Sequence, residues 1–280
     1  RPSQKCFWLF LLPTFAAFCI GFLYPFCKGF FLSFCDFKTT KNWTWVGIKN
    51  YIAAFQDKSF GHAFWYTALF AVVSLVLINV IAFAIAYALT RGIKGSNLFR
   101  TVFFMPNLIG GIVLGYIWSM IFNGILIKYS TSVVLESKYG FWGLIILMCW
   151  QQIGYMMIIY VAGLQSVPGD LIEAAKIDGA SMFQRILHID IPELVPMIVL
   201  QLIMSVGNLM NVGFEKVLLL QTELNKATSD IIAVYVYEQG IINAKYSYST
   251  AVGLFNTVVN IILLIIVNRI AKKAADVSFV

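Results

Sequence analysis

Residues 167–192 read VPGDLIEAAKIDGASMFQRILHIDIP and differ in character from the long apolar stretches on either side of them. The segment is polar at both flanks, but its apolar residues recur at helical spacing before and after Gly179, which predicts two short amphipathic helices. A glycine at this place can adopt positive φ and turn the chain, and Ser181 can then cap the second helix. We therefore predict a helix–turn–helix over 165–193, ended by Pro192.

Six apolar stretches surround this segment, each long enough to cross about 30 Å of hydrocarbon as a helix. Apolar residues make up 60% of the chain and charged residues only 12%, against about 25% in an ordinary soluble domain. Isolated strands cannot serve as spans, because every backbone polar group must be hydrogen-bonded inside the bilayer. We expect an all-α polytopic membrane protein with one transmembrane domain over 1–280 and spans at about 7–34, 63–89, 102–122, 141–164, 194–220 and 251–270.

Basic residues mark one side of this predicted membrane protein. Arg91, Lys94 and Arg100 follow the second span, and further Lys and Arg residues lie near both ends of the chain. By parity these three places fall on one side, and the positive-inside rule makes that side the cytoplasm, although four lysines between 38 and 58 weaken the bias. We therefore expect both termini and the segment 165–193 to be cytoplasmic.

The charge pattern and the motifs argue against several other classes of protein. The net charge is +7, but the Lys and Arg residues are scattered over loops, so we expect no nucleic-acid partner. The five cysteines show no metal-ligand spacing, and His62 and His188 fall on opposite sides of the membrane, so we predict no metal site. The chain has no G-x-x-x-x-G-K-[ST] loop and no catalytic arrangement, so we expect neither ATP binding nor enzymatic activity in this chain.

The small residues and charges of 165–193 suit contact with a soluble partner. Ala174 and Ala175 allow close approach of another surface. The carboxylates of Glu173 and Asp178 can accept hydrogen bonds from basic or backbone donors. Five acidic residues stand against two basic ones in the segment, an excess that fits a partner with basic groups. The composition alone is equally compatible with a solvated loop helix or with a helix lying in the membrane interface.

The spacing within this segment resembles a known signature. Three residues separate Glu173-Ala174-Ala175 from Gly179, nine separate Gly179 from Ile189, and one separates Ile189 from Ile191-Pro192. This order resembles the E-A-A, three, G, nine, I, one, L-P signature of permeases in binding-protein-dependent ABC importers, with Ile where Leu is usual. The resemblance implies a type I ABC importer permease fold and an ATPase-coupling role for Glu173, Ala174, Ala175, Asp178, Gly179, Phe183, Arg185 and Pro192.

Two further stretches resemble the carbohydrate branch of these permeases, which includes the maltose permeases. They are NVGFEKVLLL at 211–220 and YSYSTA at 246–251, and both look like the subfamily for polysaccharide or large-oligosaccharide uptake. The resemblance implies a second homologous permease subunit, two ATP-binding subunits that bind ATP and Mg, and an external solute-binding protein. It also implies a bacterial cytoplasmic membrane, with lipid around the spans.

Polar residues within the spans are candidates for a solute pathway, because sugar hydroxyls need hydrogen-bond donors and acceptors. Asn208, Asn211 and Glu215 are spaced so that they share one face of a continuous helix. The other candidates are Gln151, Gln152, Tyr155, Asn256 and Asn260. Hydrogen bonding between helices explains many such residues equally well, and we expect Gly110, Gly111 and Gly115 to be helix-packing positions.

The function predicted from these features is carbohydrate import by alternating access, driven by ATPase subunits that move the segment 165–193. Two alternatives stay open. One is a carrier or channel that works without ATP, for which Glu215 is the only internal carboxylate to offer. The other is an ABC permease for a solute that is not a sugar.

Overall fold

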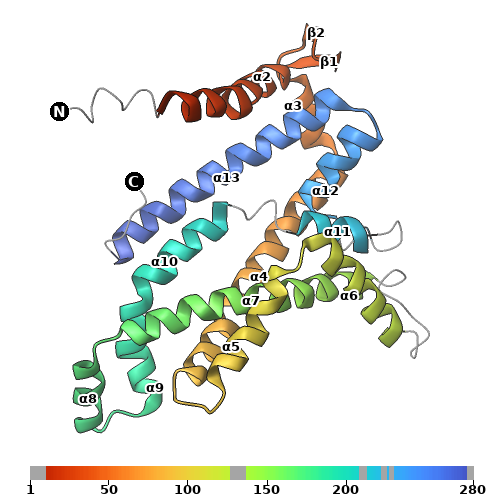
Figure 1. Cartoon of the computed structure of the whole chain (residues 1–280). Helices are drawn as coiled ribbons and strands as arrows, with labels where there is room; N and C mark the ends of the chain where they lie inside the picture. Colours follow the sequence, from red (N-terminus) through yellow and green to blue (C-terminus); the bar gives the residue numbers. More distant parts are fainter. Residues whose placement is uncertain (1–10, 127–136, 208–212, 222–225, 227–229, 276–280) are drawn as a thin grey trace, which may run out of the picture. The chain divides into compact units, whose positions relative to one another are not determined.

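The computed structural model describes residues 11–126, 137–207, 213–221, 226 and 230–275, and it is predominantly helical (Figure 1). Five described helices are long and apolar enough to cross a membrane, or six if one bent pair counts as a single span. The first half of the chain begins with a continuous helix, Leu11–Leu32, which has a π-helical turn at Cys19–Leu23 and whose last part is α2 (Tyr24–Leu32). It continues with β1 (Cys35–Thr39), β2 (Asn42–Trp45), α3 (Lys49–Gln56), α4 (Lys58–Leu89), α5 (Ser96–Phe104), a 3-10 turn (Met105–Leu108) and α6 (Gly111–Leu126). The second half contains α7 (Ser137–Ser166), α8 (Gly169–Ile177), α9 (Met182–Arg185), a π-helical turn (Ile186–Asp190), α10 (Ile191–Gly207), α11 (Phe214–Leu220), α12 (Ile232–Tyr237), a π-helical turn (Glu238–Ile242) and α13 (Tyr246–Ala275).

The third predicted span, 102–122, is not one straight helix. Its chain breaks between Leu108 and Gly111, and the two helical pieces on either side are bent by 103°. Ile109 adopts an extended backbone at this break, three residues after Pro106. The side chain of Gln151 on α7 donates a hydrogen bond to the carbonyl oxygen of Ile109 (3.2 Å), so the broken helix exposes a backbone acceptor that α7 satisfies.

The fifth predicted span, 194–220, is likewise not a single helix. Helix α10 ends at Gly207, residues 208–212 lie outside the described part of the chain, and α11 begins at Phe214. Gly213 before α11 has φ of +80°, a left-handed conformation that a glycine adopts without steric cost and that stops α11 from extending backwards.

The chain divides into two compact units. The described residues of Arg1–Gly61 and Tyr235–Val258 form the small unit, and those of His62–Val234 and Val259–Val280 form the large unit. In the small unit β1 and β2 pair antiparallel with Cys35 opposite Trp45, and an irregularity follows at Phe37/Thr39.

Long-range polar contacts fix the hairpin of the small unit to the start of α13. Ser247 on α13 accepts a hydrogen bond from the backbone of Phe37 (2.8 Å) and donates one to Asp36 (2.9 Å). Asn50 on α3 donates to the carbonyl oxygens of Ser33 (3.0 Å) and Cys35 (2.9 Å). The two bonds of Ser247 join parts of the chain that are 210 and 211 residues apart in sequence, whereas those of Asn50 are local.

Helix α7 runs through the core of the large unit and packs against α5, α6, α10 and α11. Close approach depends on glycines at two crossings. A side chain at Gly154 would overlap the backbone of Phe103 on α5, and one at Gly163 would overlap Leu194 on α10. Gln152 and Tyr155 of α7 line a space shared with α4 and α10, whereas Gln151 contacts the broken helix.

Candidate functional site

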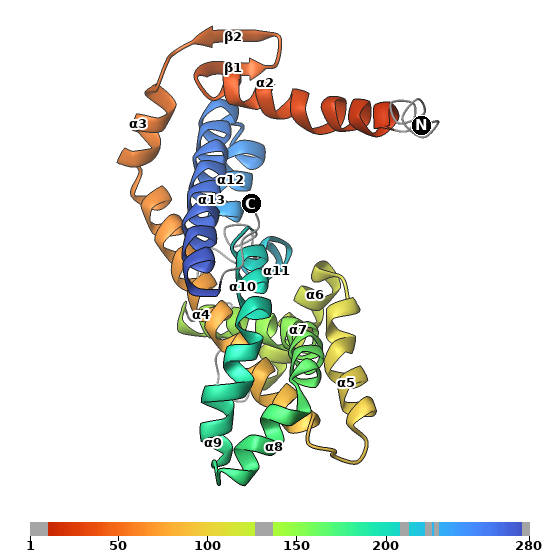
Figure 2. The same ribbon diagram turned by 90° about the vertical axis from the view of Figure 1, so that its left-hand side faces the viewer.

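The segment between α7 and α10 forms the predicted helix–turn–helix, which Figure 2 shows beyond the end of α7. Gly179 has φ of +72°, as predicted for the turn. Ser181 caps α9 by accepting a hydrogen bond from the backbone of Gln184 (3.4 Å), and the side chain of Gln184 accepts one from the backbone of Ser181 (2.8 Å). We call this element, α8 to the π-helical turn 186–190, the knob.

The prediction that Pro192 ends the second helix is wrong. The chain stays helical from Met182 to Ser205, and Pro192 is the second residue of α10. The π-helical turn Ile186–Asp190 precedes it, with Ile191 donating to the carbonyl oxygen of Ile186. This wider turn removes the crowding that a proline ring meets in a regular α-helix, so the helix passes through.

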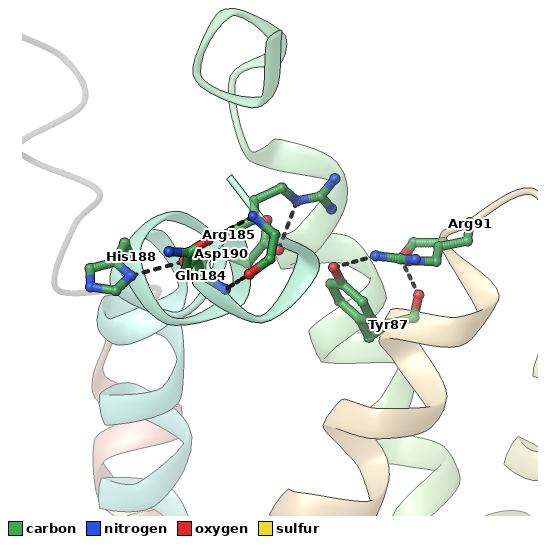
Figure 3. Close-up of polar contacts among 8 residues, drawn as sticks. Tyr87, Arg91, Gln184, Arg185, His188 and Asp190 are labelled. Carbon is green, nitrogen blue, oxygen red and sulfur yellow. Dashed lines mark hydrogen bonds and ion pairs between the residues drawn. The ribbon is translucent and has the colours of Figure 1, made fainter. Parts of the chain in front are cut away.

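The same wide turn brings Arg185 and Asp190 together (Figure 3). The Nε atom of Arg185 lies 3.2 Å from Oδ2 of Asp190, whose side chain is almost fully buried. In a regular α-helix, positions five apart point about 140° away from each other, so regular helical spacing does not predict a pair between these two residues. The ion pair therefore directs Arg185 toward its own chain.

Tyr87, near the end of α4, lies close to two guanidinium groups (Figure 3). Arg91 donates a hydrogen bond to the tyrosine hydroxyl (2.6 Å), and its guanidinium carbon lies 4.6 Å from the ring centre. The guanidinium carbon of Arg185 lies 5.7 Å from the same ring centre. Cations over an aromatic face are attracted by its quadrupole, so Tyr87 links the end of α4 to the knob.

The exposed surface of the knob combines carboxylates with large apolar side chains. Ile177 is 85% exposed and Phe183 is 68% exposed. Glu173, Ala174 and Asp178 are also exposed. Such a surface suits burial against another protein.

The two adjacent alanines of the knob differ. Ala174 is exposed, as close approach of a partner requires, but Ala175 is buried against its own chain. Ala175 is therefore available for packing inside the large unit and not for contact with a partner. The difference follows from the 100° between adjacent helical positions.

A second feature of the large unit is a cavity of about 290 Å³ between α4, α7 and α10. The predicted residues Gln152 and Tyr155 both line it. Four further polar residues line its wall and were not among the predicted pathway residues: Ser74, Asn79, Gln201 and Ser205. Each lies within a predicted apolar span, so the rule that flagged Gln152 was also able to find them.

Gln151 and Glu215 lie elsewhere in the large unit. Gln151 is buried and supports the broken helix through Ile109. Glu215 is exposed, and a side chain at Gly111 would overlap its carboxylate, so Gly111 permits α6 to pack against α11. The neighbouring Lys216 is buried, with Nζ 3.3 Å from the sulfur of Met148.

The expected face shared by Asn208, Asn211 and Glu215 requires one continuous helix. This expectation is wrong for Glu215, because the left-handed Gly213 starts a new helix in front of it. Asn208 and Asn211 themselves lie outside the described residues. Glu215 therefore belongs to the contact between α6 and α11.

Asn256 and Asn260 lie one turn apart on α13. Asn256 is buried and Asn260 is half-buried. Within the described part of the chain neither Oδ1 atom has a hydrogen-bond partner, although both are shielded from solvent. Buried amide oxygens of this kind are free to accept a hydrogen bond from a further group.

Residues 80–276 match the family of binding-protein-dependent transport system inner membrane components. The chain belongs to this family. As a permease it is an all-α, multi-pass membrane protein, which confirms the fold class and the family resemblance predicted from the sequence.

The permease is similar to several transport system permease proteins along most of its length. It is 34% identical to the probable starch degradation products transport system permease protein AmyD of Thermoanaerobacterium thermosulfurigenes, over 94% of this chain and 91% of that protein. It is 28% identical to the polygalacturonan/rhamnogalacturonan transport system permease protein YteP of Bacillus subtilis, over 83% of this chain and 76% of the relative. In a crystal structure of a bacterial ABC transporter involved in the import of the acidic polysaccharide alginate, one chain matches with a TM-score of 0.86 and 26% identity, over 97% of both chains.

The small unit of the permease holds a compact polar cluster of Asp57, Tyr235 and Tyr248. Both tyrosine hydroxyls donate to Oδ2 of Asp57, at 2.7 Å and 3.2 Å, and the two hydroxyls lie 2.7 Å apart. Partial burial acts to raise the pKa of Asp57, but hydrogen bonds from Tyr235, from the backbone of Ser59 and from Tyr248 outweigh it and hold this pKa below its ordinary value. Burial, Tyr248 and the nearby carboxylate raise the pKa of Tyr235, so its hydroxyl stays protonated and continues to donate.

Proposed function

We propose that this permease carries oligosaccharides or polysaccharide fragments across the bacterial cytoplasmic membrane by alternating access. The observation that carries the proposal is the cavity between α4, α7 and α10, whose wall bears six polar side chains inside a membrane protein. Amides and hydroxyls of this kind match the hydroxyl groups of a sugar, and the ring of Tyr155 offers a flat face to its C–H surface. The relatives named for starch products, polygalacturonan and alginate support the same class of solute.

The size of the cavity supports a paired permease. Its volume of about 290 Å³ lies at the lower end of the range of about 300–1,000 Å³ that small-molecule sites occupy. An oligosaccharide needs more room than this, so the proposed pathway is completed by a second permease chain, which we take to be a homologous but different subunit. Asn208, Asn211, Asn256 and Asn260 stay predictions for the pathway from the sequence.

The knob is the proposed contact for two ATP-binding subunits, which would bind ATP and Mg and hydrolyse the nucleotide. Its apolar side chains Ile177 and Phe183 are exposed, and Glu173 and Asp178 are available for basic partner groups. In this arrangement the knob and both termini are cytoplasmic, and an external solute-binding protein delivers the sugar from the opposite side. ATP-driven closure of the ATPase pair would move the knob and turn the cavity outward.

Uptake by the complete importer in proteoliposomes tests the pathway. Labelled maltooligosaccharides, oligogalacturonates and alginate oligosaccharides are each supplied with the solute-binding protein. Gln152→Leu and Gln201→Leu each remove an amide from the cavity, and each should lower transport of the accepted sugar by about fivefold to tenfold, because one hydrogen bond contributes about 1 kcal/mol. Gln56→Leu, at the exposed end of α3, is the matched control.

Three results would count against the proposal. If none of the sugars is taken up while an amino acid or another solute is, the carbohydrate assignment fails. If both cavity variants transport sugar as well as Gln56→Leu does, the cavity is not part of the pathway. Uptake that proceeds without ATP would exclude the coupling role of the knob.

A further inference from the structure

A second hollow lies behind the knob, away from the solute cavity. It has a volume of about 700 Å³ and is bounded by the ends of α4 and α7 together with α8 and α9. Its wall includes apolar side chains from α7, from the knob and from the link between them, among them Leu164, Ile172 and Val167. The hollow is thus large and partly apolar, and it lies where two spanning helices end.

The charges of this wall are unbalanced. Arg91, Lys176 and Arg185 contribute three positive groups, while Asp190 is the one acidic residue of the lining. Asp190 is only 1% exposed and already holds Arg185 at 3.2 Å. The two remaining cations, Arg91 and Lys176, therefore face the hollow without a carboxylate in its described wall.

The guanidinium of Arg91 is held in place before any ligand arrives. Its hydrogen bond to the hydroxyl of Tyr87 uses one N–H group and leaves the others of its planar fork available. The ring of Tyr87 also lies 5.7 Å from the guanidinium carbon of Arg185, which lines the hollow. A fixed guanidinium beside an ammonium is the arrangement that binds phosphate oxygens.

We propose that this hollow binds the phosphodiester headgroup of an anionic phospholipid from the cytoplasmic leaflet. Arg91 and Lys176 hold the phosphate, and the apolar wall receives the glycerol and the first methylene groups of the acyl chains. The hollow lies at the ends of the spanning helices α4 and α7, and basic pockets between membrane helices bind the headgroups of anionic lipids. Free inorganic phosphate is also an anion, but it leaves the apolar wall and most of the volume unused. The proposal relies on the cytoplasmic side of the knob and does not depend on which solute is carried.

The test uses the complete importer, purified and reconstituted in nanodiscs of phosphatidylcholine with an equal amount of phosphatidylglycerol. Native mass spectrometry and phosphorus analysis measure the phosphatidylglycerol that stays bound after extraction into detergent. Each cation near an anionic headgroup contributes a factor of about five in affinity, so Arg91→Gln or Lys176→Gln should each reduce retention about fivefold, and the double variant about 20-fold. Arg91→Lys keeps the charge and should restore most of the binding.

Lys94→Gln is the matched control, because Lys94 is an exposed lysine of the same loop that does not line the hollow. It should retain phosphatidylglycerol as the unmodified importer does. Thermal unfolding of each variant, followed by tryptophan fluorescence, shows that the protein is folded before lipid is counted. Retention that is equal in the double variant and in Lys94→Gln would overturn the proposal.

Two further arms distinguish other occupants. Inorganic phosphate, added at millimolar concentration to the delipidated importer, should not protect Arg91 from guanidine-directed chemical labelling, whereas phosphatidylglycerol should. Protection by phosphate alone would mean that the ligand is a soluble anion. Retention by the isolated permease but not by the complete importer would mean that an ATPase subunit fills the hollow, which also contradicts the proposal.

Discussion

The knob and the Asp57 cluster are both small polar structures in the same membrane protein, yet different kinds of hydrogen bond stabilise them. The knob takes its shape from neighbours in sequence, since Gly179, Ser181 and Gln184 make the turn and its cap within six residues. The cluster joins Asp57 to Tyr235 and Tyr248, which lie 178 and 191 residues further along the chain. The knob leaves large apolar side chains exposed, whereas the cluster uses all three of its polar groups internally.

This difference distinguishes a surface that is available to bind a partner from a cluster that stabilises the fold. A locally determined knob can keep its shape while it is pushed, because its own backbone hydrogen bonds maintain it. A long-range cluster contributes to stability only when distant segments are already packed, so its loss should affect unfolding more than transport.

Replacing Gly179 with valine should have the largest effect. A left-handed backbone costs a non-glycine residue about 1–2 kcal/mol, and a β-branched residue more, so the turn between α8 and α9 is expected to change shape. Sugar uptake by the complete importer should fall about tenfold or more, while ATP hydrolysis continues without being coupled to it. Both rates are measured on the same proteoliposomes.

Gly169→Ala is the control for this prediction, because space is open around that residue and its φ is not in the left-handed range. It should transport at nearly the normal rate. Coupled uptake by the Gly179→Val importer would show that the turn geometry is unimportant, and the contrast drawn above would then fail on the side of the knob.

Truncating Phe183 to alanine should weaken the hold of the ATP-binding subunits. The ring is mostly exposed in this chain, so its removal leaves the permease itself intact but removes an aromatic anchor of about 2 kcal/mol from the proposed interface. Co-purification of the ATPase subunits at low protein concentration should fall by about tenfold. Phe15→Ala, which removes a ring that is 55% exposed from the first span, should leave co-purification unchanged.

Replacing Tyr235 with phenylalanine should destabilise the small unit without uncoupling transport. The hydroxyl is hydrogen-bonded to both Asp57 and Tyr248, and its loss leaves these groups less satisfied at a cost of about 1–2 kcal/mol. The unfolding midpoint in detergent should fall, while uptake per folded complex at moderate temperature stays near normal. A variant with unchanged stability and lost uptake would place this cluster in the transport machinery.

Acidification should produce the smallest effect, through Asp57. Its pKa in the folded protein lies below the ordinary value of 3.8, so the folded state binds the proton less tightly than the unfolded state does. The stability that Asp57 contributes is therefore fully present at neutral pH and is lost as the pH falls through the range below about 4. The unmodified permease should lose slightly more thermal stability on acidification than Asp57→Asn does, and equal losses would contradict the pKa shift.

Three of the spanning helices and the shape of the knob were predictable from the sequence. Apolar length alone located α4, α7 and α13, and the turn and cap of the knob followed from Gly179 and Ser181. These features depend on hydrogen bonds and periodicities that act within a few residues. The coupling residues themselves stay predictions, because their partner is a different chain.

The places where sequence reasoning failed share a physical cause. Pro192 lies in a continuous helix, and Asp190 reaches Arg185, because a π-helical turn changes the local geometry that regular helical spacing assumes. Similarly, Glu215 is removed from the predicted asparagine stripe by a left-handed glycine, a conformation that the residue permits but does not require. Local spacing cannot distinguish a regular helix from one with such a turn.

The sequence by itself determined that this chain is a polytopic helical permease with a capped knob between α7 and α10, because apolar length, the spacing of the signature and the capping residues are local properties. Only the tertiary structure decided which polar residues share a space: Gln152 and Tyr155 with Asn79 and Gln201 around one cavity, and Arg91 with Lys176 around the hollow behind the knob. These groupings depend on the packing of distant helices, which glycine contacts and a 103° bend set in three dimensions. These groupings of polar residues cannot be predicted from any periodicity along the chain.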